Sequence, residues 1–389
     1  MTLPSRPSPT PAIVSKLPKV GTTIFTVMSA LANQYRSVNL GQGFPDFDCD
    51  PRLLDAVDQA MRAGQNQYPP MSGVAELRQA IAAKIRALYG ATYHPDTEIT
   101  VTAGATQAIF TAIMAVVQPG DDVIVIEPMY DSYLPNIVLA GANPVCVPMT
   151  DEFTIDWSRV EAAVTARTRA ILVNTPHNPS GRILRDDDLR ALEAIAQAHD
   201  LFVIADEVYE HMVFDGQTHA SASRYPGLVA RSFVISSFGK TFHVTGWKVA
   251  YCAAPAAMTA EFRKVHQYLV FTVNTPAQAG LARYMADPAP YLQLPAFYQR
   301  KRDLFREGLA GTRFRLLPCE GTYFQVVEYS AISEQPEAEF AQWLTREIGV
   351  TAIPMSAFYD APIERRKVRF CFAKKDETLA DALARLSRI

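Results

Sequence analysis

The sequence has few cysteines, and their arrangement excludes a disulfide scaffold and a cysteine metal site. Five cysteines, an odd number, are spread along the 389 residues: Cys49, Cys146, Cys252, Cys319 and Cys371. No two have the close spacing of metal ligands, and a disulfide framework needs a denser, paired set. We therefore predict no metal site and a chain that works in the reducing cytoplasm.

An excess of one charge and a long apolar run are also missing. The 37 basic and 40 acidic side chains leave a formal net charge of −3, which favours neither a nucleic-acid surface nor an acidic membrane. The longest apolar stretch, residues 108–117, is interrupted by Thr111 and is too short to cross a bilayer. Residues 1–19 are rich in Pro and Ser and lack the apolar core of a signal peptide, so we expect an N-terminal arm. Neither nucleic acid nor a membrane is an expected partner.

The composition that remains is that of an ordinary globular protein, with 49% hydrophobic, 10% aromatic and 20% charged residues. A chain of this length exceeds what one hydrophobic core usually supports. We predict an N-terminal arm with part of a small domain over residues 1–45, a large domain over 46–289 and a small C-terminal domain over 290–389.

Short apolar strands alternate with helical patterns through the large domain. Strands are predicted at 98–102, 122–127, 169–174, 201–205 and 232–236. Strands that are apolar throughout are typical of βαβ units with both sheet faces covered. Residues 247–252 follow the last of them too closely for a helical crossover, so they should pair antiparallel.

The C-terminal part has a different pattern. Helices near 336–347 and 376–388 lie among short predicted strands at 316–317, 321–327, 350–353 and 368–372. Strands mixed with helices in this way predict a smaller α+β domain.

Polar residues follow five of the strands of the large domain. Because ligands of open α/β sheets bind beyond the carboxyl ends of the strands, these loops predict one shared site: 104–106, 129–130, 174–181, 206–209 and 237–240. Ala105 and Thr106 begin a helix, where backbone N–H groups bind phosphate. Ser237, Lys248 and a tyrosine from elsewhere would complete such a cradle.

Three charged residues suit the rest of a cofactor and substrate. Asp206, at the end of a buried strand, needs a cationic partner such as a protonated pyridine nitrogen. Lys240, in the same crevice, has the setting of an amine with a lowered pKa that forms a Schiff base. Arg369 suits a bidentate grip on a carboxylate. Together with the phosphate cradle they describe pyridoxal 5′-phosphate bound to an amino acid.

Each residue alone has an ordinary alternative. Most lysines are solvated surface charges, an aspartate can cap a helix, and the sequence at 178–181 is common in turns. Two other motifs are excluded. A phosphate loop ending at Lys240 needs glycine where the chain has Val234, and the Ser-x-x-Lys of acyl-enzyme hydrolases lacks its companion motifs.

Ten segments carry a resemblance to a known family: VNLGQGFPDF (38–47), QNQYPPMSG (65–73), VTAGATQAIF (101–110), EPMYDSY (127–133), NTPHNPSG (174–181), ADEVYE (205–210), SSFGKTFHVTGWKVAY (236–251), VHQYLVFTVNTPAQ (265–278), LPCEGTYF (317–324) and VRFCFAKK (368–375). In this order and spacing the chain, over residues 18–389, resembles class I aminotransferases of the pyridoxal-phosphate fold type I, in their methionine/kynurenine branch.

The resemblance implies an α/β fold: a large domain with a mostly parallel seven-stranded sheet between helices, plus a smaller α+β domain. It also implies a transaminase that moves the amino group of methionine, and of aromatic and aliphatic amino acids, to a 2-oxo acid by a ping-pong mechanism. The alternative on the same scaffold is a kynurenine aminotransferase or a cysteine-conjugate β-lyase.

The family's site residues transfer by position. The resemblance implies that Lys240 forms the internal aldimine, that Asp206 pairs with the pyridine nitrogen, and that Tyr209 and Asn178 bind the cofactor's phenolic oxygen. Tyr130 would stack on the ring. The implied phosphate ligands are Ala105, Thr106, Ser237, Lys248 and, from the other subunit, Tyr68. The substrate carboxylate would be bound by Arg369, Asn178 and the backbone of Gly43.

Two positions depart from the family's pattern, one at the phosphate site and one that bears on the substrate. Lys248 stands where many aspartate aminotransferases carry arginine, and Thr22 stands where kynurenine-type enzymes often carry tryptophan. The segment 265–278 has no second arginine for a distal carboxylate, and its Tyr268, Phe271 and Val273 suit apolar side chains. We therefore expect methionine first, then Phe, Tyr and Leu. Because Tyr68 and this segment would complete a neighbour's site, we expect a symmetric homodimer with shared active sites.

Overall fold

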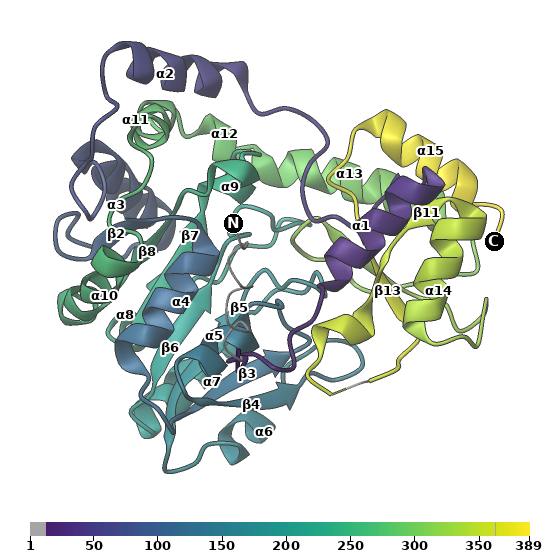
Figure 1. Cartoon of the computed structure of the whole chain (residues 1–389), viewed down its shortest axis with the longest axis horizontal. Helices are drawn as coiled ribbons and strands as arrows, with labels where there is room; N and C mark the ends of the chain where they lie inside the picture. Colours follow the sequence, from purple (N-terminus) through teal and green to yellow (C-terminus); the bar gives the residue numbers. More distant parts are fainter. Residues whose placement is uncertain (1–12, 362) are drawn as a thin grey trace, which may run out of the picture.

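The computed structural model describes residues 13–361 and 363–389, so residues 1–12 of the expected arm lie outside the described part. The larger part of the molecule is built around a seven-stranded sheet with helices on both faces (Figure 1). In order across the sheet its strands are β2 (Ile99–Thr102), β8 (Ala250–Ala253), β7 (Ser232–Ser237), β6 (Phe202–Asp206), β5 (Thr168–Asn174), β3 (Asp122–Glu127) and β4 (Asn143–Pro148). β8 is antiparallel to both of its neighbours, and the other pairs are parallel. The predicted mostly parallel seven-stranded sheet and the antiparallel strand after residue 247 are confirmed.

The central strands are apolar on both faces because each face has its own core. Along β3, Val123 and Val125 belong to one hydrophobic cluster, whereas Ile124 and Ile126 belong to another. Helices α4 (Ala105–Val116) and α5 (Tyr133–Leu139) cover the first face, and α7 (Asp186–Ala198) covers the second. The predicted βαβ pattern therefore holds in the described residues, with α7 beginning on three aspartates that suit its helix dipole.

The smaller sheet is antiparallel and has four strands: β12 (Ile353–Pro354), β13 (Lys367–Cys371), β10 (Phe324–Glu328) and β9 (Arg315–Leu316). The single strand predicted at 350–353 is wrong. The chain changes sheets at Ala352, because β11 (Val350–Thr351) pairs in parallel with β1 (Val38–Asn39) and only β12 joins β13. The strand predicted from residue 321 begins at Phe324, because Thr322 has a φ of +64°, which a β-strand does not allow.

The remaining helices cover the two sheets (Figure 1). Near the small sheet lie α1 (Ile24–Tyr35), α13 (Leu294–Leu309), α14 (Glu337–Trp343, continued by a π-helical turn over Leu344–Ile348) and α15 (Asp376–Leu386). The others belong to the large sheet and its edges: α2 (Pro51–Arg62), α3 (Ala75–Tyr89), α6 (Trp157–Ala162), α8 (Pro226–Val229), α9 (Phe238–Thr241), α10 (Ala256–Leu269), α11 (Thr275–Tyr284) and α12 (Ala289–Leu292).

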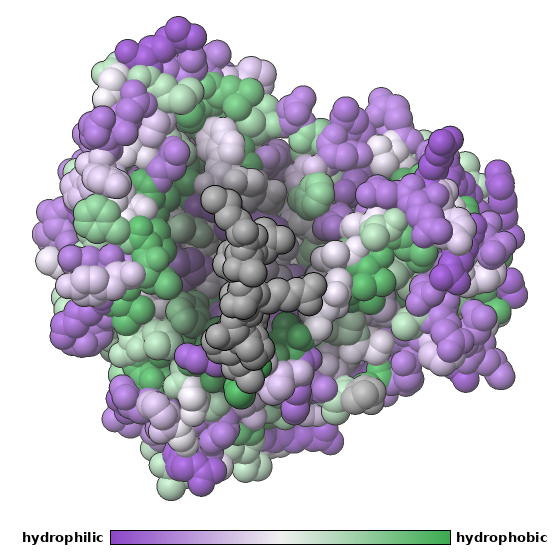
Figure 2. Space-filling model, viewed as in Figure 1, coloured by the Kyte–Doolittle hydropathy of each residue, from purple (hydrophilic) through white to green (hydrophobic). Residues whose placement is uncertain are grey.

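The N-terminal segment lies beside the small sheet: β1 and β11 form a separate two-stranded sheet, and α1 contacts both β11 and β12. Figure 2 shows the surface hollowed between this part and the part that carries α2, α3 and α11, with hydrophobic surface along the second part's margin. No described helix combines the length and apolarity that a membrane span requires.

Candidate active site

The sheet brings the predicted polar loops to one edge. β2, β3, β5, β6 and β7 end there, and their pairing places Asn174 opposite Asp206. Ser237 and Thr102 both face Ala250, the first residue of the antiparallel β8. Lys248, two residues before β8 begins, therefore lies at this same edge of the sheet. Register thus assembles residues that lie more than a hundred positions apart in the sequence.

Lys240 lies in α9, directly after β7, with its amine turned toward the small sheet. Its Nζ donates to the hydroxyl of Tyr323 at 3.0 Å and to the carbonyl of Gly43 at 3.3 Å. Burial, together with the charges of Arg369 and Lys248, lowers the pKa of this amine to about 8. An amine with this pKa is neutral in a useful fraction near physiological pH and can act as a nucleophile or base.

Asp206 is a buried carboxylate without a cation beside it. It is 4% exposed at the end of β6, and no described Lys, Arg or His forms a salt bridge with it. Its Oδ2 accepts a hydrogen bond from the Tyr133 hydroxyl at 2.6 Å, and its Oδ1 accepts one from the Val208 amide at 3.3 Å. Burial raises its pKa to about 6, against these hydrogen bonds and the charge of Lys240. A protonated ring nitrogen is the partner that such a carboxylate lacks.

A cradle for a phosphate forms where α4 begins. Gly104 precedes the helix with a φ of +83°, and a Cβ at this position would meet the Nζ and Cε of Lys248 at 2.9 Å. The Lys248 ammonium therefore lies against the helix N-terminus, where Ala105 and Thr106 present backbone N–H groups. Lys248 itself adopts a left-handed φ of +54°, a strain that proteins often keep at functional sites.

Arg369 is the buried cation predicted for a substrate carboxylate. It is 1% exposed on β13, and its guanidinium donates to Asn178 Oδ1 at 2.6 Å and to the Gly41 carbonyl at 3.1 Å. The ring of Phe324 lies 3.9 Å from the guanidinium carbon. Burial lowers its pKa to about 10, so it stays charged. Its Nε is buried without a hydrogen-bond partner, which leaves donor capacity for a ligand.

The aromatic site residues line the same crevice, with one exception. Tyr209 is 3% exposed, and the amine of Lys240 lies 5.6 Å from its ring centre. Burial raises the pKa of Tyr130, and the nearby Thr106 hydroxyl opposes this rise. Tyr68 is the exception: it is 82% exposed, and its described aromatic contact is with Phe271, at 5.2 Å. A single chain does not bring Tyr68 to the site.

Sequence reasoning missed two tyrosines at this site. Tyr133 donates to Asp206, and Tyr323 accepts from Lys240. Both lie inside segments that carry the resemblance, 127–133 and 317–324. Their position within those segments was the one signal that could have identified them as site residues, because a tyrosine as a residue type predicts only packing.

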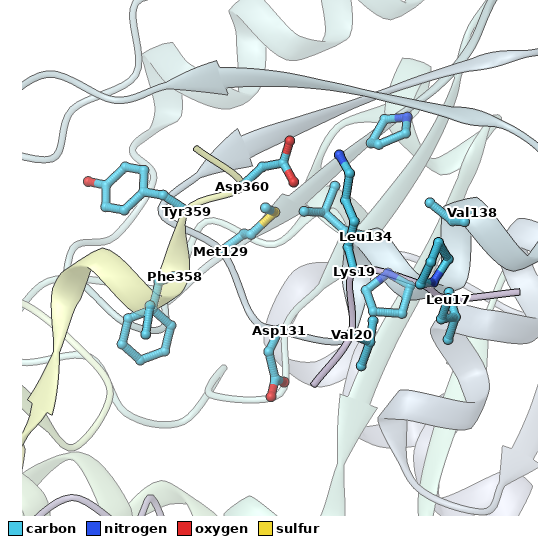
Figure 3. A pocket seen from close by; sticks show the side chains of 14 residues that line it. Leu17, Lys19, Val20, Met129, Asp131, Leu134, Val138, Phe358, Tyr359 and Asp360 are labelled. Carbon is cyan, nitrogen blue, oxygen red and sulfur yellow. The ribbon is translucent and has the colours of Figure 1, made fainter. Parts of the chain in front are cut away.

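The structure also contains a cavity of about 640 Å³ (Figure 3). Its walls come from residues 17–20, from α5 and the residues before it, and from residues 357–360. Phe358 links it to the site, because its ring lies 4.8 Å from the Arg369 guanidinium. Asp131 lines it too: desolvation raises the pKa of Asp131, and the charge of Arg369 opposes that rise. The mostly apolar cavity therefore shares Phe358 and Asp131 with the surroundings of Arg369.

Comparisons with known proteins agree with this geometry. The family model for class I and II aminotransferases matches residues 35–386. The methionine aminotransferase of Escherichia coli (strain K12) is 51% identical over 377 residues, which cover 96% of this chain and 98% of that protein. A probable N-succinyldiaminopimelate aminotransferase, DapC, of Mycobacterium tuberculosis is 42% identical over 387 residues, with 96% and 98% covered.

A solved structure gives the same result. The crystal structure of YbdL from Escherichia coli, described with a methionine aminotransferase function, matches with a TM-score of 0.96 and 50% identity. The match covers 97% of this chain and 100% of that one. The chain therefore belongs to the class I and II aminotransferase family and is a transaminase that depends on pyridoxal 5′-phosphate.

Proposed function

We propose that this transaminase prefers methionine as amino donor, then phenylalanine, tyrosine and leucine, and passes the amino group to a 2-oxo acid in two half-reactions. The observation that carries the proposal is the apolar cavity beside Arg369. No arginine occurs among its described lining residues, and its cation, Lys19, comes from an exposed segment. The Asp131 carboxylate disfavours a second carboxylate on the substrate. Similarity to the methionine aminotransferase of Escherichia coli supports the same donor.

The site residues divide the work between binding and proton transfer. Pyridoxal 5′-phosphate supplies an aldehyde that takes up the amino group and a ring that accepts the electron pair left by the departing α-proton. We assign its phosphate to Ala105, Thr106, Ser237 and Lys248. Tyr130 would stack on its ring, and Tyr209 and Asn178 would bind its phenolic oxygen. Asp206 holds the proton on the ring nitrogen, because an ionised buried carboxylate favours a cation beside it.

Arg369 and Lys240 act on the amino acid itself. Arg369, with Asn178 and the Gly43 backbone, binds the α-carboxylate and so fixes which bond of the α-carbon faces Lys240. The free amine of Lys240 takes the proton from the α-carbon as general base and then gives it up again as general acid. Its pKa of about 8 suits both roles near neutral pH.

The first expected result concerns the amino donor. Single-turnover rates of the pyridoxal form should give methionine the highest kcat/KM, with aspartate lower by about 10²-fold or more, because a buried second carboxylate would lack a partner. The panel should include Phe, Tyr, Leu, kynurenine and N-succinyldiaminopimelate. Aspartate above methionine would reject the proposal, and kynurenine or the succinyl compound above methionine would reassign the donor. Release of pyruvate and ammonia from a cysteine conjugate, faster than methionine turnover, would make the chain a β-lyase.

We also propose that the active enzyme is a symmetric homodimer in the cytoplasm. Tyr68, Tyr268 and Phe271 are 82%, 88% and 44% exposed on this single chain, which is unusual for large aromatic side chains without a partner. A second copy would cover them and bring Tyr68 to the neighbouring phosphate. The free state of all five cysteines agrees with a reducing compartment.

Mixing two disabled variants tests the shared site. Lys240→Ala removes the amine of its own site, and Tyr68→Asp sets a carboxylate against the partner's phosphate. A hybrid dimer contains one site with both changes and one with neither, so random mixing should restore about a quarter of the parent's activity. The two variants assayed separately serve as controls. A mixture no more active than the mean of the two separate variants would contradict the dimer. So would a fully active parent enzyme that sediments as a monomer.

A further inference from the structure

Tyr323 occupies a position that the assigned reaction does not yet explain. Its hydroxyl lies between the amine of Lys240 and the N-terminal segment. It donates to the Gly43 carbonyl at 2.6 Å and lies 3.0 Å from the Lys240 Nζ. A phenol has one proton. Since that proton goes to Gly43, the oxygen of Tyr323 is an acceptor toward Lys240.

The two oxygens around Lys240 determine where its lone pair points. A neutral amine has two N–H groups and one lone pair. Tyr323 accepts from one N–H, and the Gly43 carbonyl, 3.3 Å away, accepts from the other. With both donors engaged, the lone pair points away from both oxygens, in the remaining tetrahedral direction. The amine is thereby oriented as a base before it meets a proton.

The hydroxyl of Tyr323 is held firmly enough to do this. The side chain is fully buried, and the rings of Tyr209, Phe324 and Tyr298 lie 5.2, 4.8 and 5.6 Å from its own. Burial raises its pKa well above the usual value, so the phenol keeps its proton at neutral pH. Tyr323 therefore does not exchange protons itself, and its contribution is geometric.

We propose that Tyr323 is a positioning residue for proton transfer: together with the Gly43 carbonyl it holds the released amine of Lys240 with its lone pair directed at the substrate's α-carbon. This inference rests on the proposed function only in taking Lys240 as the proton carrier. It concerns the interval in which Lys240 is free, when its amine has no other hydrogen bond among the described residues.

The chain contains a matched control for this proposal. Tyr298 is buried against Tyr323, yet its hydroxyl has no hydrogen-bond partner. Tyr298→Phe and Tyr323→Phe therefore remove the same atom from neighbouring buried sites. Only the second removes a contact with Lys240.

The experiment compares the two variants with the parent enzyme. For Tyr323→Phe we expect kcat in the amino-acid half-reaction to fall on the order of ten- to a hundredfold, with KM nearly unchanged, because a misdirected base slows the chemical step alone. The isotope effect with α-deuterated amino acid should rise, because proton transfer then limits the rate. Tyr298→Phe should leave kcat, KM and the isotope effect as in the parent.

A titration of the protein without cofactor gives an independent readout. The pH dependence of its condensation with added pyridoxal 5′-phosphate reports the pKa of Lys240. An acceptor stabilises the ammonium, so its loss in Tyr323→Phe should lower the midpoint by about one pH unit. This arm remains decisive even if the parent turns over no amino acid, which would overturn the proposed function alone.

Two results would overturn the inference. One is a Tyr323→Phe enzyme whose kcat, isotope effect and condensation midpoint match those of Tyr298→Phe. The other is a KM that rises by the same factor by which kcat/KM falls. That pattern would mean that the variant moved the N-terminal segment, with the Gly41 carbonyl that Arg369 contacts, and left the amine of Lys240 in place.

Discussion

Replacing Lys240 with alanine is expected to lower transamination of methionine by about 10⁴-fold or more, since the variant loses both the group that bonds the cofactor and the base that moves the α-proton. Binding of pyridoxal 5′-phosphate should survive in weaker form, because the phosphate cradle at Gly104 and Lys248 and the Asp206 carboxylate remain. The half-reaction with methionine, followed by the cofactor's absorbance, measures the loss.

Borohydride reduction separates the two contributions. It should fix the cofactor to the parent chain and not to the Lys240→Ala chain. The control is Lys375→Ala, which removes an exposed lysine directly before α15 and should leave both turnover and fixation intact. A Lys240→Ala enzyme that turned over at the parent's rate, or that still fixed the cofactor, would disprove the assignment of Lys240.

The strands that the sequence predicted well are those buried on both faces. β3, β5, β6 and β7 read as continuous apolar runs because each face of the sheet has its own core. β4 escaped prediction, since it is a partly exposed edge strand that begins near Pro144 and ends at Pro148, and proline argues against a strand everywhere except at an edge. The split at Ala352 was equally hidden, because pairing with β1 depends on a segment some three hundred residues away.

The same reasoning separates the predictable from the unpredictable site residues. Charged residues at the ends of buried strands, such as Asp206 and Lys240, stand out because burial of a charge needs a reason. A tyrosine does not stand out in this way. Tyr298 and Tyr323 are both fully buried, yet one hydroxyl has no partner and the other binds Lys240, 83 positions away. Only the three-dimensional arrangement distinguishes them.

Asp206→Asn is expected to trade activity for stability. The amide keeps the shape and can accept the Tyr133 hydroxyl, but it removes the negative charge that holds the ring nitrogen protonated. We expect kcat/KM to fall by about 10³-fold, as when a preorganised charge is removed from an active site, and the cofactor to dissociate more readily. Stopped-flow half-reactions and dialysis of the loaded enzyme measure these two effects.

The stability of the protein without cofactor should change in the opposite direction. The pKa of Asp206 is about 6 in the folded chain, above its unfolded value, so the folded state binds this proton more tightly. Its ionisation therefore lowers the free energy of unfolding by roughly 3 kcal/mol. This loss is absent below about pH 4 and complete above about pH 6. Asparagine carries no such cost. The cofactor-free variant should have the higher Tm at pH 7.5, with an advantage that vanishes as the pH approaches 4.

Asp122 supplies the contrasting control. It too is buried, but hydrogen bonds from Thr165 and Asn143 and the charge of Arg167 lower its pKa. Its ionised form is therefore stabilised by the fold at neutral pH, and Asp122→Asn should lower the Tm where Asp206→Asn raises it. If both variants lost stability at pH 7.5, Asp206 would be a structural carboxylate like Asp122. If Asp206→Asn gained stability and lost activity, then the protein keeps an unpaired buried charge whose cost is offset only when a cationic ring lies beside it.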